Sequence, residues 1–252
     1  MKPIGIVSAL VAEARALGPA ARHGAGLRRL ADGALLAVSG IGEGAAAAAA
    51  RRLVLAGATG LASFGMAGGL DPALICGAVL LPEEVMARDG VTVSATAGDW
   101  RQRLRAALPA SCIACGGRLL TSGRPIGTPE AKAAAWRQSR AAAVDMESAA
   151  VAQVAGQAGV PFIVLRVIVD TASDELPAAV IAASGSGQPR LGRLLGELLR
   201  APREVGALIR LSARYRIATR VLAAVAGPPS PSRRALTDGP GDAHPIAPAE
   251  TA

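Results

Sequence analysis

Two carboxyl groups stand where an apolar, strand-like run ends, which is where open α/β sheets place ligand-binding groups. Glu147 follows the short apolar run 142–144, and Asp170 comes directly after the longer run Phe162–Val169. If the runs are neighbouring buried strands, both carboxyl groups reach one sheet edge, where burial raises their pKa values. A carboxyl group with a raised pKa can donate a proton or bind hydroxyl groups, so this pair predicts acid–base chemistry.

A third carboxyl group, Glu13, lies early in a helix-like segment that follows the apolar run 4–8. In that position a glutamate is commonly a solvated residue that the helix dipole favours. The alternative is that Glu13 points back toward the strand end and joins the other two carboxyl groups. Asp145 is expected to point the other way, capping a helix or pairing with a cation at the domain surface.

Two glycine-rich segments also follow apolar runs. Residues 39–44 (S-G-I-G-E-G) lead into a helix, and their glycines would let a ligand approach backbone amides. They are not a dinucleotide fingerprint, because the third glycine is out of register and no acid follows about 20 residues later. Residues 65–72 (G-M-A-G-G-L-D-P) follow the run 61–64. Either segment could be a binding loop or a plain turn.

Histidine and cysteine give little support for metal or nucleophilic chemistry. The two histidines are His23 and His244, so a histidine-based triad is poorly supported. Cys112 and Cys115 form a C-x-x-C, but without a second pair or a nearby histidine this is a weak zinc signal. We expect ordinary reduced cysteines and no bound metal.

The elements that must position these groups alternate between strand and helix. Strand composition occurs at residues 4–8, 35–38, 61–64, 78–81, 142–144 and 162–169, and helical composition at 11–17, 43–56, 99–107, 130–138 and 147–158. Continuously apolar strands are buried on both faces, and their alternation with helices implies crossover connections. Apolar residues make up 51% of the chain and aromatic residues 2%, so the core must be aliphatic. The pattern predicts a three-layer α/β/α domain over residues 1–185.

The last quarter of the chain differs in charge and pattern. Residues 186–226 hold eight arginines and two glutamates, which gives +6 of the net charge of +8. Apolar residues on both sides of Pro202 follow helical spacing, which predicts a basic amphipathic helical hairpin. Residues 227–252 are rich in proline, glycine and serine without an apolar period, and we expect them to be disordered.

A basic amphipathic segment has three candidate partners. Nucleic acid is disfavoured, because Tyr215 is the only aromatic residue within 186–226. Arginines on one helix face and leucines on the other can lie on an anionic bilayer. The alternative is packing on the domain or on a second subunit. Because the sequence shows no secretory leader or membrane span, we expect a cytoplasmic protein, peripheral at the inner face of the membrane.

Six segments, in order and spacing, resemble the nucleoside phosphorylase and nucleosidase superfamily, nearest the methylthioadenosine/adenosylhomocysteine nucleosidases. They are I-G-I-V-S-A-L-V-A-E at 4–13, S-G-I-G at 39–42, G-M-A-G-G-L-D-P at 65–72, S-G at 122–123, V-D-M-E-S at 144–148 and L-R-V-I-V-D-T-A at 165–172. The resemblance implies a nucleoside phosphorylase-like fold with a mixed central sheet. It also implies that residues 1–185 cleave the N-glycosidic bond of a purine nucleoside, and that the chain forms a homodimer or higher homo-oligomer.

The resemblance implies a role for each matching residue. Glu13 would activate the attacking water, and Glu147 would bind the ribose 2′- and 3′-hydroxyls, with Met146 packed against the sugar. Asp170 would donate a proton to N7 of the purine. In addition, Ala67 and Gly68 would lie along the nucleoside, and Ile126 would stand where the family usually stacks an aromatic residue on the base.

The nucleophile is open between water and phosphate. A carboxylate at Glu13 would repel a phosphate ion, which favours water. Inorganic phosphate is expected as a co-substrate only if the enzyme is a phosphorylase, and no other cofactor is expected.

The arginine- and leucine-rich extension, together with E-L-P-A-A at 175–179, resembles a narrower group, the hopanoid-associated nucleosidases/phosphorylases. This resemblance implies adenosylhopane as substrate, with adenine and ribosylhopane as products in hopanoid biosynthesis. Methylthioadenosine or adenosylhomocysteine is the alternative substrate. The non-enzyme alternative is a protein that binds nucleosides at the membrane surface without catalysis.

Overall fold

Two long parallel strands, β5 (Leu61–Gly69) and β12 (Phe162–Asp170), lie at the centre of the sheet in the computed structural model, which describes residues 3–177, 180–181 and 205–240. The order across the sheet is β2-β3-β4-β1-β5-β11-β10-β7-β8, and β12, β6 and β9 branch from β5. The remaining strands are β1 (Gly5–Ser8), β2 (Ala20–His23), β3 (Leu27–Leu30), β4 (Leu35–Val38), β6 (Val79–Leu80), β7 (Glu84–Met86), β8 (Val93–Ala95), β9 (Ala114–Cys115), β10 (Arg118–Thr121) and β11 (Ala141–Asp145). Parallel and antiparallel pairs both occur, so the expected mixed sheet is confirmed.

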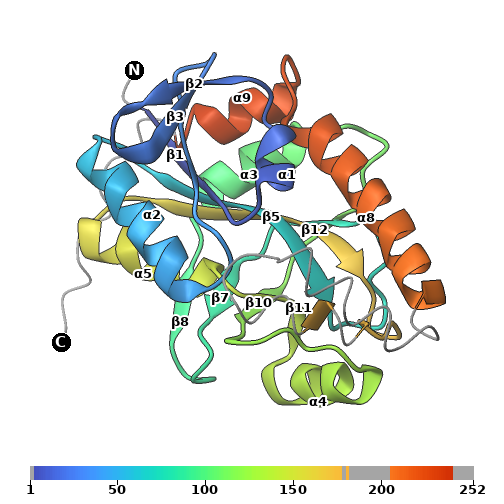
Figure 1. The fold of residues 1–252 in the computed structure, drawn as a ribbon. Coiled ribbons are helices and arrows are strands. Elements are labelled where there is room, and N and C mark those ends of the chain that lie inside the picture. The colour runs from blue at the N-terminus through green and yellow to red at the C-terminus, as the bar shows by residue number, and fades with distance from the viewer. Residues whose placement is uncertain (1–2, 178–179, 182–204, 241–252) are drawn as a thin grey trace.

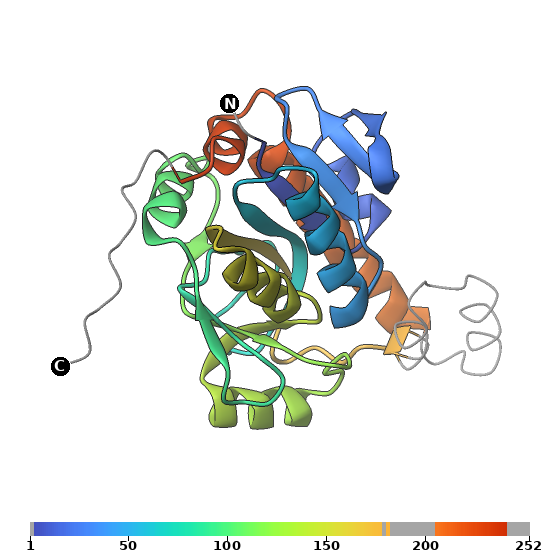
Figure 2. The ribbon, with the colours of Figure 1, turned by 90° about the vertical axis from the view of Figure 1, so that its left-hand side faces the viewer.

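Helices cover both faces of this sheet (Figures 1 and 2). The helices are α1 (Val11–Arg15), α2 (Glu43–Leu55), α3 (Gly98–Ala106), α4 (Pro129–Ser139), α5 (Ser148–Ala158), α8 (Val205–Ala226) and α9 (Pro231–Thr237), with a 3-10 turn at Gly24–Gly26. One core lies under α2 and α5, and a second lies under α1, α3, α8 and α9. The three-layer α/β/α architecture is therefore confirmed.

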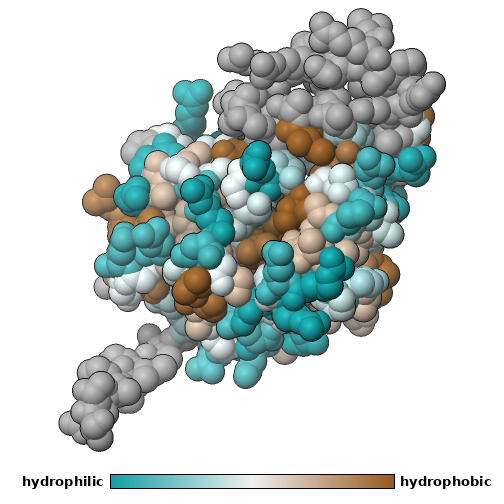
Figure 3. Space-filling model, turned by 90° about the horizontal axis from the view of Figure 1, so that it is seen from below, coloured by the Kyte–Doolittle hydropathy of each residue, from teal (hydrophilic) through white to brown (hydrophobic). Residues whose placement is uncertain are grey.

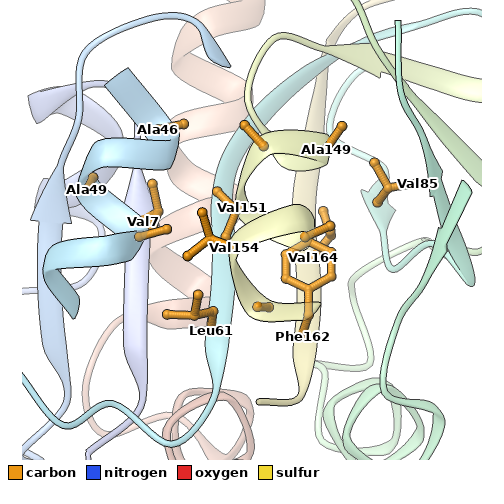
Figure 4. Close-up of a cluster of buried hydrophobic side chains, with 14 of the residues drawn as sticks. Val7, Ala46, Ala49, Leu61, Val85, Ala149, Val151, Val154, Phe162 and Val164 are labelled. Atoms are coloured by element: carbon orange, nitrogen blue, oxygen red, sulfur yellow. The ribbon is translucent and has the colours of Figure 1, made fainter. Parts of the chain in front are cut away.

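Small side chains let α2 and α5 pack closely on the sheet. The buried face of α2 is largely alanine, and α5 adds alanine and valine to the same cluster (Figure 4). Phe162 and Leu61, at the starts of the two central strands, fill the space beneath these helices. A nearly aromatic-free sequence thus builds its core from many small aliphatic contacts.

The glycine-rich segment 65–72 differs from expectation, because its first half is strand and not loop. β5 continues to Gly69, pairing with β12 on one side and with β11 at its end. A Cβ added at Gly69 would lie 3.1 Å from the backbone oxygen of Asp170. The glycines therefore allow three strands to meet closely. Sequence analysis also missed the β2–β3 hairpin and the short strands β7, β8 and β10.

The C-terminal region only partly matches its prediction. Residues 182–204, with the first half of the expected hairpin, lie outside the described residues, and so do 241–252. α8 forms as expected, and its apolar face (Ala218, Leu222, Val225) is fully buried in the second core. The same helix therefore packs on the main domain, as one of the alternatives held.

The expectation of disorder from residue 227 onward is wrong for residues 227–240. α9 packs beside α3, where Leu236 is fully buried and the Trp100 indole N–H donates to the Ala235 oxygen at 2.9 Å. Buried Arg233 donates to Asp32 at 2.6 Å and to two backbone oxygens. A helix of seven residues is too short to show an apolar period, which is why the pattern was missed.

We predict that Leu236→Ala destabilises the protein by about 2–5 kcal/mol, because it leaves a cavity between α9, α3 and the sheet. Chemical denaturation measures the change. Leu55→Ala is the matched control, since Leu55 is 86% exposed and should change stability little. Equal effects of the two substitutions would mean that α9 does not pack as described.

Candidate functional site

A cavity of about 250 Å³ opens at the carboxyl ends of β5, β11 and β12. Its lining includes every residue that the sequence nominated: Glu13, Ala67, Gly68, Ile126, Met146, Glu147 and Asp170. Leu211 and Tyr215 of α8 add to the wall. Viewed from the side to which these strand ends point, hydrophobic surface gathers in a hollow with hydrophilic residues around it (Figure 3).

Backbone amides fix the carboxylate of Glu13. Its Oε2 accepts hydrogen bonds from the Leu10 amide at 3.0 Å and the Ser8 hydroxyl at 3.2 Å, while Oε1 accepts from the Met66 amide at 2.9 Å. The side chain is 3% exposed, so Glu13 is the inward-pointing residue and not a solvated helix-start glutamate. Burial raises its pKa, and the charge of Arg166 opposes that rise.

Gly65 makes room for this carboxylate. A Cβ at this position would lie 2.6 Å from Oε1 of Glu13 and 2.6 Å from a terminal nitrogen of Arg166. No side chain fits there, so the glycine lets the Glu13 carboxylate and the Arg166 guanidinium both approach the central strand at this point.

Glu147 sits at the start of α5, with its side chain turned into the cavity. Oε1 accepts a hydrogen bond from the Gly42 amide at 2.8 Å, so the segment 39–44 supplies a backbone donor to a protein carboxylate. Burial, and then the neighbouring Asp145, raise the pKa of Glu147 to about 7, while Arg166 opposes them. This carboxyl group can therefore change protonation state near neutral pH.

Asp170 ends β12 beside Gly68, where an added Cβ would come within 3.2 Å of its Oδ2. That oxygen accepts a hydrogen bond from the ammonium group of Lys132, which is fully buried in α4. Burial raises the pKa of Asp170, and the charge of Lys132 is the largest opposing effect. The prediction that burial raises the pKa values at this sheet edge is confirmed.

Asp145 does not point to the surface, contrary to expectation. It is 5% exposed and pairs with Arg166, which reaches it through two nitrogens at 2.6 and 3.0 Å. Thr121 donates to the other oxygen of Asp145 at 2.8 Å. The carboxylate turns inward because a buried guanidinium needs a full counter-charge at hydrogen-bond distance.

Sequence reasoning missed two buried cations of the site, of which Arg166 is the first. It is 1% exposed, donates to Ser63 and Ser148 at 2.9 and 3.1 Å, and lies 3.8 Å from Glu147. The signal was present, because an arginine in the middle of a nine-residue apolar strand must have a buried partner. Lys132 was missed because it belongs to a helix whose other charged residues face outward.

The cysteines do not form a second reactive centre. All three are free, and burial raises the pKa of Cys115 to about 11, which makes its thiol a poor nucleophile. Within the described ranges no group of histidine, cysteine, aspartate and glutamate side chains could hold a metal ion. Over the same ranges, no helix is long and apolar enough to cross a membrane.

The fold and the site together define an α/β protein with buried carboxyl groups around a cavity of about 250 Å³. Residues 27–200 match the model of the phosphorylase superfamily, and the chain belongs to this family. The resemblance to nucleoside phosphorylases and nucleosidases is thereby confirmed. A search of curated proteins finds no match to the chain.

Solved structures share the fold at low sequence identity. One is the 5′-methylthioadenosine/S-adenosylhomocysteine nucleosidase of Neisseria meningitidis in complex with methylthio-immucillin-A, with a TM-score of 0.67, 22% identity, and 89% of this chain and 96% of that chain covered. Another is the futalosine hydrolase of Helicobacter pylori, with a TM-score of 0.62 and 22% identity; the match covers 77% of this chain and 97% of that chain. A third is the 5′-methylthioadenosine/S-adenosylhomocysteine nucleosidase of Colwellia psychrerythraea in complex with adenine, with a TM-score of 0.61 and 25% identity; the match covers 79% of this chain and 96% of that chain.

The raised pKa of Glu147 predicts a pH-dependent effect of Glu147→Gln on stability. The folded-state pKa of about 7 exceeds the ordinary value of 4.5, so ionising this group costs folding free energy. That cost is absent below the ordinary value and complete above the folded-state value. Glu147→Gln should therefore stabilise the protein by up to about 3 kcal/mol more at pH 8 than at pH 4.5.

Urea denaturation at the two pH values measures this difference. The matched control is Glu130→Gln on the exposed side of α4, which should give nearly the same stability change at both. A stability change at Glu147 that does not depend on pH would contradict the raised pKa.

Proposed function

We propose that this protein cleaves the N-glycosidic bond of a purine nucleoside, with water as the nucleophile. The observation that carries the proposal is the convergence of Glu13, Glu147 and Asp170, from distant parts of the chain, on one cavity. Breaking a glycosidic C–N bond requires a neutralised leaving base and stabilised positive charge on the sugar. Buried carboxyl groups, some protonated and some ionised, supply both.

Each residue takes a distinct part in this reaction. Asp170 in its protonated form donates to N7, so that the base leaves as a neutral purine. Glu147 accepts hydrogen bonds from the ribose hydroxyls, with Met146 packed against the sugar, and Glu13 takes a proton from the attacking water. Ala67 and Gly68 lie along the nucleoside, and Ile126 contacts the base.

The charges around the cavity favour water over phosphate. Among the described residues that line it, Arg124 is the only cation, and its side chain is exposed. Arg166 lies deeper and already pairs with Asp145. A phosphate ion would therefore lie beside the carboxyl groups of Glu13 and Glu147, with the exposed Arg124 as its only cationic neighbour in the described lining.

The apolar wall of the cavity favours a nucleoside with an apolar substituent, and we propose adenosylhopane, cleaved to adenine and ribosylhopane in hopanoid biosynthesis. Leu10 and Ile41 belong to the wall, and Leu211 and Tyr215 of α8 also contribute to it. Buried apolar area of this kind contributes about 25 cal/mol per Å² to binding an apolar group. Methylthioadenosine and adenosylhomocysteine are the competing substrates, since similar folds occur in nucleosidases named for them.

We further propose that the outer face of α8 contacts an anionic membrane surface, where a lipid-linked nucleoside resides. This face exposes Arg210, Arg216 and Arg220 together with Ile209 and Ile217. Arginines attract anionic headgroups while the isoleucines enter the interface. The proposed location is the cytoplasmic side of the membrane, and the proposed assembly is a homo-oligomer.

We expect Asp170→Asn to lower adenine release by about 10²–10⁴-fold, because asparagine has no acidic proton for N7. Absorbance measures the release of adenine from adenosylhopane, methylthioadenosine and adenosylhomocysteine, each with and without inorganic phosphate. Asp89→Asn, at an exposed loop position, is the matched control and should keep full activity. Nucleoside binding without release of adenine would identify a binding protein, and a requirement for phosphate would identify a phosphorylase.

Changing Arg210, Arg216 and Arg220 together to glutamine should weaken co-sedimentation with phosphatidylserine vesicles on the order of 100-fold, at about 1 kcal/mol per arginine. The control changes three exposed arginines of the β2–β3 hairpin, Arg22, Arg28 and Arg29, and so removes the same charge elsewhere. Equal loss in both triple variants would mean that net charge, and not α8, drives the association.

A further inference from the structure

The ammonium group of Lys132 binds three oxygen atoms at the end of β12. It donates to Oδ2 of Asp170 and, at 2.8 Å each, to the backbone oxygens of Thr171 and Asp174. The lysine side chain is fully buried. All three of its N–H donors therefore have partners, and the side chain is fixed in one position.

A lysine at this position is unusual for this chain. Of the 27 lysine and arginine residues, only Lys2 and Lys132 are lysines. The compact ammonium group presents its donors tetrahedrally to three separate oxygens, whereas a planar guanidinium could not satisfy them in the same space. The site thus departs from the chain's preference for arginine where a small, buried point charge is needed.

The contact restricts where Asp170 can carry a proton. An ammonium group only donates, so the oxygen that faces it must accept, and a proton on Oδ2 would face another proton. In the protonated acid the hydrogen must then lie on Oδ1. That oxygen makes no hydrogen bond within the described part of the chain, which leaves it free for a ligand in the cavity that Asp170 lines.

We propose that Lys132 is a positioning residue for the leaving-group acid: it places the proton of Asp170 on Oδ1 and stabilises the carboxylate that remains after transfer. The inference rests on the proposed function. As the C–N bond breaks, its electron pair stays with the purine, N7 takes the proton from Oδ1, and Asp170 becomes an anion. The adjacent ammonium lowers the energy of that anion, which makes Asp170 a stronger acid.

Other charged groups act on Asp170 less directly. Asp174 raises its pKa and Arg214 of α8, which is paired with Asp174, lowers it, both with smaller effects than Lys132. Cys76 also lies close enough for its thiol to respond to the charge of Asp170. Lys132 is thus the largest favourable influence on the ionised acid, and the one in direct contact with it.

The test is the pH dependence of adenine release in Lys132→Met, using the soluble nucleoside that the wild-type protein cleaves best. Because only protonated Asp170 donates, activity falls as pH rises through its pKa. Removing the ammonium should shift this fall upward by about 1–3 pH units and lower kcat by about tenfold or more, with little change in KM. A lysine that merely supports the fold would lower activity without moving the pH profile, and that result would overturn the proposal.

Two further measurements keep the test independent of turnover and folding. If Lys132→Met does not fold, Lys132→Gln replaces it in the test, because glutamine keeps N–H donors but loses the charge. The fall in activity should shift to higher pH in this variant too. With lysine labelled at Cε, the NMR spectrum contains two lysine signals, and the signal lost in a Lys132 variant belongs to Lys132. That signal should show a titration step in the wild-type protein, and Asp170→Asn should abolish the step. The signal of Lys2 is the control. No adenine release by the wild-type protein would refute the proposed function itself, whereas an active wild type with an unshifted Lys132 variant would refute this inference alone.

Discussion

The buried guanidinium of Arg166 is the interaction on which the rest of the site depends. It lies within the central strand, pairs with Asp145 and carries its charge to within 3.8 Å of Glu147. Burial and mutual repulsion would otherwise raise the free energy of so many carboxyl groups in one place. Burial raises the pKa values of both Glu13 and Glu147, and the charge of Arg166 lowers them, so the guanidinium opposes the effect of burial on both carboxyl groups.

Backbone amides then orient the carboxyl groups whose charge Arg166 stabilises. The amides of Leu10, Gly42 and Met66 each donate to a carboxylate oxygen, and they come from three different strand-to-helix or strand segments. Donors of this kind do not reorganise when charge changes during a reaction, so the side chains stay in position. Gly65 and Gly68 allow this arrangement because they let the carboxyl groups of Glu13 and Asp170 approach β5 closely.

α8 joins the stability of the fold to the shape of the site. Its buried face closes the second core through Leu222 and Val225, while Leu211 and Tyr215 of the same helix form part of the cavity wall. The helix that supplies the basic outer surface is therefore also the helix that limits the space around a ligand. A change in its packing would alter both the core and the cavity.

The sequence by itself determined which residues follow strands, which helix faces are apolar and how the layers alternate, because these depend on periodicity within a single element. Glu13, Glu147 and Asp170 could be nominated in this way, and the buried face of α8 could be read from its spacing. Only the tertiary structure decided the partners: Gly42 binds Glu147 across 105 residues, and Lys132 binds Asp170 across 38. A local pattern gives the direction of a side chain relative to its own element, but which group that side chain contacts depends on how distant elements pack. For this reason the sequence placed Asp145 wrongly and did not reveal Arg166 and Lys132 as residues of the site.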